Sequence, residues 1–352
     1  MTDPRPEPLP VERYDYEVPP ELIAQQPAEP RDSARLLVVS RSSGALTDRV
    51  FRDLPSLLQP GDLVVVNDTR VMPARLMATR ASGGRIELLL LVRLPDGTWR
   101  SLARPARRLR HGETLTLMDH DDTVTTDTVH VVERDSEAVV VSFADEGAIQ
   151  RHGRVPLPPY IRDTSADPER YQTVYSREPR SAAAPTAGLH FTPDVMEACR
   201  ERGIDFASVT LHVGLDTFQP IKTADARDHQ IHSEWFEISE ETMIAVAQAK
   251  RTGRRIVAVG TTSVRTLESA ADAILSTASR AASISGPTGL YITPGYQYQI
   301  VDAMLTNFHL PRTTLLLLVS AFAGEELVRA AYAHAIQERY RFYSFGDAML
   351  IV

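Results

Sequence analysis

The sequence predicts an α/β fold in which a mainly parallel-sheet α/β domain is interrupted by an inserted small all-β, barrel-like domain. The chain has 352 residues, more than one hydrophobic core usually holds, which favours two domains. Strand and helix patterns alternate beyond Gly188, as in βαβ units. Between Arg75 and Phe143 the chain instead holds short β-rich runs separated by turn residues, which is typical of a small barrel or sandwich.

These patterns predict the domain boundaries. Residues 1–73 form the first part of the α/β domain, residues 74–152 form the inserted β-barrel-like domain, and residues 153–352 form the second part of the α/β domain, with the catalytic motifs. We expect residues 1–12 to be disordered, because this stretch is charged, rich in proline and without an apolar run.

Apolar runs predict the strands of the first two segments. The β-branched run at 61–67 follows the breaker Pro60-Gly61 and ends at Asn67, which indicates a buried strand. A further strand is predicted at 36–39. In the inserted domain, strands are predicted at 85–94, 98–104, 112–118, 123–134 and 137–143.

The third segment begins with a long connection and continues with alternating elements. Residues 156–188 are polar and punctuated by proline, which favours a lid or a substrate-binding loop. Ser239 is a candidate N-cap and Gly324 a candidate C-cap. Strands are predicted at 206–213, 254–260 and 302–308, and helices at 239–253, 261–282, 309–324 and 325–340.

Composition excludes several classes of protein. The only cysteine, Cys199, falls on the apolar face of a predicted helix, which favours a buried side chain and excludes a disulfide framework. We expect no membrane span, because the longest apolar stretch, 315–323, is far shorter than a span of about 20 residues. With no signal-peptide pattern at the N-terminus, a cytoplasmic location is expected. The chain has only two lysines and lacks the GxSxG, GxGxxG and P-loop motifs.

Opposite charges gather in two adjoining blocks, although the net charge is −8. Residues 70–112 hold ten arginines and two acids, whereas residues 113–150 hold ten acids and one arginine. One interpretation is charge pairing across strands within the inserted domain. The other is a basic face that binds the phosphates of a nucleic acid. The candidates for that face are Arg75, Arg85, Arg104, Arg107 and Arg108.

Polar side chains follow the predicted strands where each strand ends. Ligands of α/β proteins bind beyond the carboxyl ends of parallel strands, so we expect these side chains to line one site. They are Asn67, Asp68 and Arg70 after the first strand; His212 and Gly214 after the second; Thr261, Thr262 and Arg265 after the third; and Asn307 and His309 after the fourth.

Histidines near these strand ends fit either acid–base catalysis or a metal site. His229, His232 and Glu234 are spaced as metal ligands, but a third histidine would have to come from elsewhere and no HExxH or HxH string is present. We therefore expect no metal. A metal-dependent hydrolase and a non-catalytic RNA-binding protein remain alternatives at this point.

The turn Gly260-Thr-Thr-Ser precedes a predicted helix and offers backbone N–H groups and hydroxyls to a carboxylate or phosphate. Arg265 and Glu268 follow at a helical spacing of three. That spacing suits a structural ion pair as well as contact with a ligand.

Taken together, the strings resemble the S-adenosylmethionine:tRNA ribosyltransferase-isomerase family from about Tyr14 to Val352. The strings are NDTRVMPARL, ASGGRIE, VPLPPYI, YQTVYS, AAPTAGLHF, TLHVG with TFQP, HSE, AVGTTSVRTLES, PGYQY, TNFHLPRTTLLLLVSAFAG and YRFYSFGDAM. The resemblance implies transfer and isomerisation of the ribosyl part of S-adenosylmethionine onto 7-aminomethyl-7-deazaguanine in tRNA. The expected products are epoxyqueuosine-tRNA, adenine and methionine. The family's fold is an α/β domain interrupted by a β-barrel-like domain.

The resemblance also implies roles for residues of this chain. The candidates for general base or acid are His190, His212, His309, Asp68 and Glu234. The candidates for substrate binding are Asn67, Arg70, Thr186, Phe191, Gly214, Thr217, Phe218, His232, Thr261, Thr262, Ser263, Arg265, Glu268, Asn307 and Asp347. The five arginines named above are the candidates for tRNA binding. Asp216 departs from the family's pattern, which has glycine there, and puts the conformation of that loop in doubt.

The resemblance defines the expected partners as well. S-adenosylmethionine is consumed as a substrate, and no cofactor is expected. The tRNA is expected to be of the GUN anticodon class and to carry the deazaguanine precursor. We expect no membrane partner and a monomeric protein.

Overall fold

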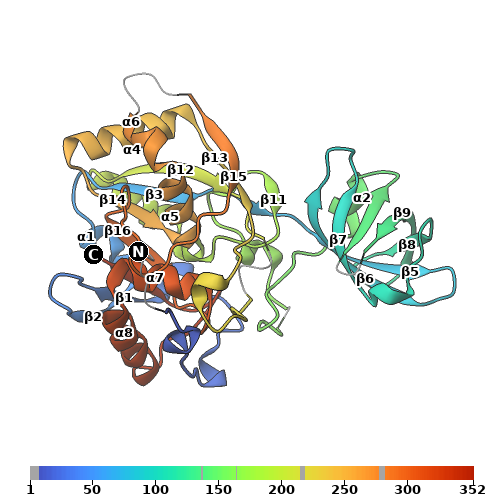
Figure 1. Cartoon of the computed structure of the whole chain (residues 1–352), viewed down its shortest axis with the longest axis horizontal. Helices are drawn as coiled ribbons and strands as arrows, with labels where there is room; N and C mark the ends of the chain where they lie inside the picture. The colour runs from blue at the N-terminus through green and yellow to red at the C-terminus, as the bar shows by residue number, and fades with distance from the viewer. Residues whose placement is uncertain (1–7, 136–137, 164, 215–218, 277–281) are drawn as a thin grey trace, which may run out of the picture. The chain divides into compact units, whose positions relative to one another are not determined.

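The computed structural model describes residues 8–135, 138–163, 165–214, 219–276 and 282–352 (Figure 1). Contacts divide the chain into two compact units. The α/β unit comprises Met1–Thr69, Pro158–Arg177 and Pro185–Val352, and the β unit comprises Arg70–Leu157 and Glu178–Ala184. Of the first twelve residues, 8–12 are described. There Leu9 and Val11 are buried, and the Val11 N–H donates to the Ala224 carbonyl at 3.0 Å.

The α/β unit is built on a nine-stranded sheet with the order β15-β13-β12-β3-β14-β16-β17-β1-β2. The strands are β1 (Arg35–Val39), β2 (Leu46–Val50), β3 (Leu63–Asn67), β12 (Asp205–Leu211), β13 (Glu234–Ile238), β14 (Ile256–Val259), β15 (Ile284–Thr288), β16 (Ala303–Asn307) and β17 (Ala348–Ile351).

This sheet is mixed, so the prediction of a mainly parallel sheet is wrong. The pairs β12-β3, β3-β14, β14-β16 and β17-β1 are parallel, whereas the other four pairs are antiparallel. Parallel strands need a crossover connection, usually a helix. No α-helix lies between β12 and β13 within the described residues, and these two strands pair antiparallel. Each antiparallel pair includes a strand outside the predicted set, which is β2, β13, β15 or β17.

Helices pack on the sheet, and their ends follow the capping residues of the sequence. The hydroxyl of Ser239 accepts a hydrogen bond from the Thr242 N–H, and Gly253 ends that helix in a left-handed conformation. Helices α4 and α6 lie beside each other (Figure 1). The helices of the unit are α1 (Leu54–Leu57), α3 (Pro193–Glu201), α4 (Glu240–Thr252), α5 (Gly260–Ser269), α6 (Ala271–Ser276), α7 (Thr314–Ala323) and α8 (Glu325–Gln337).

One apolar core joins the sheet to α1, α3 and the short 3₁₀ helix η7 (Thr186–His190). Val64 and Val66 of β3 contribute to it, as does Phe191. Cys199 of α3 is fully buried there, and burial raises the pKa of its thiol to about 11. The thiol is therefore a protonated core side chain rather than a nucleophile.

The β unit contains a separate six-stranded antiparallel sheet. Its strands pair in the order β10-β7-β6-β5-β8-β9, and β9 also pairs with β10. Alternate side chains such as Ile86, Leu88 and Leu90 face one apolar core. The strands are β5 (Arg75–Arg80), β6 (Arg85–Arg93), β7 (Trp99–Arg104), β8 (Thr114–Met118), β9 (Val124–Arg134) and β10 (Val139–Phe143), and helix α2 (Gly147–His152) follows them. Strands β4 (Arg70–Val71) and β11 (Pro179–Ser181) form a small parallel pair in the same unit.

A helix that crosses a bilayer must be both long and apolar. None of the described helices combines the length and the apolar composition that crossing a membrane requires.

Candidate active site

The carboxyl ends of β3, β12, β14 and β16 lie side by side, because these four strands are parallel neighbours. Asn67 ends β3, His212 follows β12, Gly260 follows β14, and Asn307 ends β16. The structure therefore brings together polar residues from sequence segments that lie far apart. This edge of the sheet is the candidate active site.

Asn67 is a structural bridge between two of these strands. Its Nδ2 donates to the Leu211 carbonyl, and its Oδ1 accepts from the Leu211 N–H, both at 3.1 Å. The same Oδ1 accepts from the Thr69 N–H at 3.1 Å. The amide is almost fully buried and holds the end of β12 against β3.

His212 lies directly beyond this bridge. Its ring Nδ1 is 3.0 Å from the hydroxyl of Thr69, and its backbone N–H donates to the Trp235 carbonyl. The residue is half-buried, whereas Thr69 is 1% exposed. The buried Thr69 hydroxyl is thus the hydrogen-bond partner of Nδ1, while His212 remains partly exposed to solvent.

Asp68 is a buried carboxylate on the other side of Thr69. Its Oδ1 accepts from the Thr210 hydroxyl at 2.6 Å, and its Oδ2 lies 3.4 Å from Nε of Arg177. Burial, together with the negative charge of Asp68, raises the pKa of the nearby Tyr175 hydroxyl well above its ordinary value. Tyr175 is therefore protonated at neutral pH.

A buried ion pair links β13 to α5. The Arg265 guanidinium donates through Nη1 to Oε2 of Glu234, and the two residues are only 5% and 7% exposed. Glu234 Oε1 accepts from the Gly214 N–H at 2.8 Å, and Arg265 Nε donates to the Leu290 carbonyl at 3.2 Å. Nη2 of Arg265 has no hydrogen-bond partner among the described residues.

Glu268 binds groups other than Arg265, the partner that the helical spacing suggested. Its carboxylate accepts three backbone N–H bonds of 2.9–3.0 Å from residues 299–301 and a bond from the Tyr296 hydroxyl at 3.1 Å. The structural pairing of Arg265 with Glu268 therefore does not form. Glu268 instead fastens a later segment of the chain to α5.

The first turn of α5 presents polar groups at the end of β14. Gly260 adopts a left-handed conformation with φ 85°, which suits glycine. The hydroxyl of Ser263 donates to the Val259 carbonyl, while the buried hydroxyl of Thr262 has no partner among the described residues. Thr261 is buried beside them. The turn thus combines helix N-terminal N–H groups with a buried hydroxyl.

His190 and His309 are more deeply buried than His212. Burial lowers the pKa of His190 to about 3, and that of His309 to about 3 as well. The ring of His190 packs against Phe51 with centroids 5.1 Å apart. The ring of His309 has its Nε2 2.8 Å from the Thr306 hydroxyl. Both imidazoles are neutral at physiological pH.

Two further predicted residues adjoin these histidines. Asn307 accepts from the Thr186 hydroxyl at 2.8 Å, and its Nδ2 lies 3.4 Å from Nε2 of His190. Thr186, His190 and Asn307 therefore form one cluster at the end of β16, in which His190 and Asn307 are buried and Thr186 is half-buried.

Other predicted residues have mainly structural surroundings. Phe191 is a fully buried core side chain, and the Asp347 carboxylate accepts backbone N–H bonds from Arg35 and Arg341. Arg70 begins β4 in the β unit, and His232 is exposed. Thr217 and Phe218, together with Asp216, lie outside the described residues.

A metal site would need at least three ligating side chains close together. Within the described part of the chain, no three His, Cys, Asp or Glu side chains gather in a set that could hold a metal ion. The ring of His229 instead packs against Tyr291 with centroids 5.8 Å apart.

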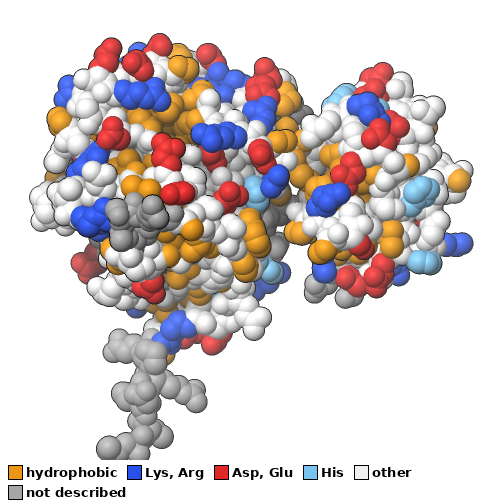
Figure 2. All heavy atoms as spheres, turned by 90° about the horizontal axis from the view of Figure 1, so that it is seen from above, with side chains coloured by type: hydrophobic (Ala, Val, Ile, Leu, Met, Phe, Trp, Pro, Cys, Tyr) orange, Lys and Arg blue, Asp and Glu red, His pale blue; other side chains and the backbone are white. Residues whose placement is uncertain are grey.

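The nine arginines from Arg75 to Arg110 fall into two groups. Five of them pair with acids: Arg75 with Glu87, Arg80 with Glu113, Arg85 with Asp122, Arg93 with Glu146 and Arg100 with Asp135. Figure 2 shows basic and acidic side chains next to one another on the visible face. Four others are exposed and have no ion pair among the described residues: Arg104, Arg107, Arg108 and Arg110.

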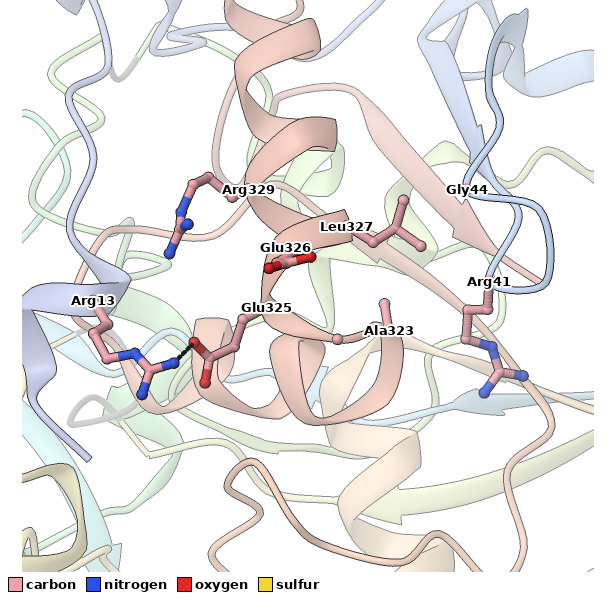
Figure 3. A pocket seen from close by; sticks show the side chains of 9 residues that line it. Arg13, Arg41, Gly44, Ala323, Glu325, Glu326, Leu327 and Arg329 are labelled. Carbon is pink, nitrogen blue, oxygen red and sulfur yellow. Dashed lines mark hydrogen bonds and ion pairs between the residues drawn. The ribbon is translucent and has the colours of Figure 1, made fainter. Parts of the chain in front are cut away.

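An open pocket of about 650 Å³ lies at the start of α8, away from the predicted residues (Figure 3). Arg13 pairs there with Glu325 at 2.6 Å, and Arg41 lies on the opposite side. None of the residues that line this pocket belongs to the predicted site.

Sequence reasoning missed Thr69 and Thr210, which contact the predicted residues directly. Thr69 stands between Asp68 and Arg70 in NDTR, so its place at a strand end was visible in the sequence. Thr210 lies within β12, and only the fold brings it to Asp68.

We expect the two buried histidines to make the α/β unit sensitive to acid. In the unfolded chain their pKa is near 6.5, whereas in the fold it is about 3. Between these values the unfolded state binds more protons. The free energy of unfolding should therefore fall as the pH drops, by up to about 1.4 kcal/mol per pH unit for each histidine.

Urea unfolding followed from about pH 6.5 to about pH 4.5 measures this slope. The variants His190→Gln and His309→Gln each lack one titrating ring and should show a shallower slope. An unchanged slope in both variants would contradict the assignment.

The chain is similar to known proteins over nearly its whole length. The family model described as queuosine biosynthesis protein matches residues 11–351. An S-adenosylmethionine:tRNA ribosyltransferase-isomerase of Symbiobacterium thermophilum is 49% identical over 344 residues, covering 96% of this chain and 98% of the relative. The enzyme of that name from Thermotoga maritima is 45% identical, covering 97% of this chain and 99% of the relative.

A solved structure is similar as well. The crystal structure of S-adenosylmethionine tRNA ribosyltransferase from Thermotoga maritima aligns with a TM-score of 0.56 and 38% identity, covering 97% of this chain and 100% of that chain. The match of the family model over almost the entire length, together with these relatives, shows that the chain belongs to the queuosine biosynthesis protein family.

Proposed function

We propose that this chain is an S-adenosylmethionine:tRNA ribosyltransferase-isomerase. It transfers and isomerises the ribosyl part of S-adenosylmethionine onto 7-aminomethyl-7-deazaguanine at the wobble position of tRNA. The products are epoxyqueuosine-tRNA, adenine and methionine. The observation that carries this proposal is the match to the family and to enzymes of this name over nearly the whole chain. S-adenosylmethionine is a substrate, and the proposal includes no cofactor.

The proposal extends to the setting of the reaction. The tRNA belongs to the GUN anticodon class and carries the deazaguanine precursor. The protein acts in the cytoplasm as a monomer. The six-stranded sheet of the β unit is a barrel-like domain inserted at residues 74–152, and its ring of antiparallel strand pairs supports this assignment.

His212 is the proposed general base. The positive sulfonium acidifies the neighbouring ribose methylene, and a base must remove one of its protons. A base with a pKa of about 3 accepts protons weakly at neutral pH, which disfavours His190 and His309. His212 is half-buried and lies at the same sheet edge.

Departure of adenine needs a proton donor, and Asp68 and Glu234 are the proposed candidates. Both are buried carboxyl groups near His212 in the fold: Asp68 precedes Thr69, and Glu234 accepts from the N–H of Gly214. The other carboxyl group is proposed to bind the ribose hydroxyls.

The methionine carboxylate is proposed to bind at the first turn of α5. Thr261, Thr262 and Arg265 supply helix N–H groups, a hydroxyl and a guanidinium. The buried Nη2 of Arg265 and the hydroxyl of Thr262 have no partner among the described residues, which supports a ligand there.

The reaction itself is tested by incubating the protein with S-adenosylmethionine and tRNA that carries the precursor. We expect free adenine and a tRNA nucleoside with the mass of epoxyqueuosine, both measured by liquid chromatography and mass spectrometry. The same tRNA without the precursor is the control and should give neither product. A folded protein that releases no adenine would refute the proposed reaction.

Replacing Arg265 with lysine tests the carboxylate site. Alanine would remove the buried guanidinium that faces Glu234, at a cost of about 3–5 kcal/mol, whereas lysine keeps the charge. We expect Arg265→Lys to weaken S-adenosylmethionine binding about tenfold or more, because a charge-assisted hydrogen bond contributes about 1.5–3 kcal/mol. Calorimetry measures the affinity, and tRNA binding should not change.

The matched control is Arg255→Lys. Arg255 pairs with the buried Asp62 at 2.6 Å, before the start of β14 and away from the site. Equal affinities for S-adenosylmethionine in the two lysine variants would remove Arg265 from the binding site.

The unpaired arginines of the β unit are proposed to bind tRNA phosphates. We expect the triple alanine variant of Arg104, Arg107 and Arg108 to bind tRNA more weakly. Its plot of log affinity against log salt should lose about 0.7–0.9 in slope for each phosphate contact removed. Fluorescence anisotropy at several salt concentrations measures the slope.

The control for this variant removes the same charge from paired arginines. Arg93, Arg100 and Arg151 all contact acids, at 2.8–3.6 Å. Their triple alanine variant should keep most of the wild-type slope, because each of these charges is already neutralised by an acid. An equal loss of slope in both variants would indicate a general charge effect and not a defined face.

A further inference from the structure

The hydrogen bond between Thr69 and His212 is the feature from which we draw a further inference. Thr69 is 1% exposed, and its Oγ1 is 3.0 Å from Nδ1 of His212. Thr69 follows β3, and His212 follows β12, which is the neighbouring parallel strand. The bond therefore joins two strand ends at the candidate active site.

An imidazole base accepts a proton at one nitrogen while the other nitrogen carries a hydrogen. If His212 accepts a proton at Nε2, its Nδ1 must carry a hydrogen. The Thr69 oxygen is then the acceptor for that Nδ1–H. A hydroxyl is neutral, so it fixes the ring without adding a charge next to a positively charged substrate.

Thr69 is itself held in place by Asn67. The Asn67 Oδ1 accepts from the Thr69 N–H at 3.1 Å. The same side chain bonds both the N–H and the carbonyl of Leu211, the residue immediately before His212. Asn67 therefore holds both partners in place: it bonds Thr69 directly, and it bonds the residue that precedes His212.

We propose that Thr69 is the positioning residue for His212, and that Asn67 positions Thr69. This inference rests on the proposed function. In the step concerned, a C–H bond of the ribose methylene beside the sulfonium breaks. The proton goes to Nε2 of His212, and the electron pair stays on the carbon. The Nδ1–H remains bonded to Thr69 throughout.

The variant Thr69→Val removes the hydroxyl and nearly keeps the shape. We expect kcat to fall about 10- to 100-fold, as misplacement of a reacting group does, while KM for S-adenosylmethionine stays within about twofold. Thr69→Ser keeps the hydroxyl and should retain most of the activity. A Thr69→Val enzyme with wild-type kcat would overturn the proposal.

A double-mutant cycle separates positioning from a general structural role. If Thr69 acts only through His212, then Thr69→Val combined with His212→Ala should be no slower than His212→Ala alone. If the two losses multiply, Thr69 acts independently and the proposal fails. Thr242→Val is the control, because the buried hydroxyl of Thr242, in α4, donates to the Ser208 carbonyl of β12, and its loss should leave kcat unchanged.

A measurement on the wild-type protein does not depend on any variant folding in active form. The ¹⁵N chemical shifts of His212, assigned by their loss in His212→Ala, report which nitrogen carries the hydrogen in the neutral ring. The Nδ1–H tautomer supports the proposal, and the Nε2–H tautomer overturns it. Absence of adenine release by the wild type would instead refute the proposed reaction.

Discussion

The parallel pairing of β3 with both β12 and β14 is the constraint on which the candidate site depends. Every residue of β3 is buried, so this strand has a fixed place in the middle of the sheet. Its neighbours run in the same direction and end at the same edge. The polar residues that follow these strands therefore meet there, whatever their separation in the sequence.

The same burial determines how charge is held at this edge. A buried ion is costly unless it has a partner, and the carboxylates here all have partners. Glu234 faces Arg265, Asp68 faces Thr210 and Arg177, and Asp347 accepts backbone N–H groups. The deeply buried imidazoles have no such compensation and are neutral instead. A substrate can reach groups that are partly exposed, such as His212. It can also bind a donor without a partner among the described residues, such as Nη2 of Arg265.

Part of this arrangement could be predicted from the sequence. The unbroken run before Asn67 and the runs before His212, Gly260 and Asn307 show where strands end, and hence which polar residues cluster. Strands β13 and β15 were not among the predicted ones, because β13 is only five residues long and β15 contains Gly286 and Pro287, which are rare in strands.

The partners of individual side chains could not be predicted either. The three N–H groups bound by Glu268 come from residues about thirty positions later, and those bonds depend on the path of the chain around α5. The basic block likewise gave no sign of which arginines pair. Arg85 of β6 pairs with Asp122 in the turn between β8 and β9, whereas Arg104 lies opposite Glu87, which pairs with Arg75 instead.

The buried state of Cys199 has a practical consequence for studying motion in this molecule. Because the only native thiol is inaccessible and protonated, the unmodified chain is a nearly silent background for thiol-specific probes. One cysteine introduced on the surface of each unit would carry a pair of fluorophores or spin labels. Energy transfer or electron resonance would then report the separation of the two units in solution, with and without tRNA.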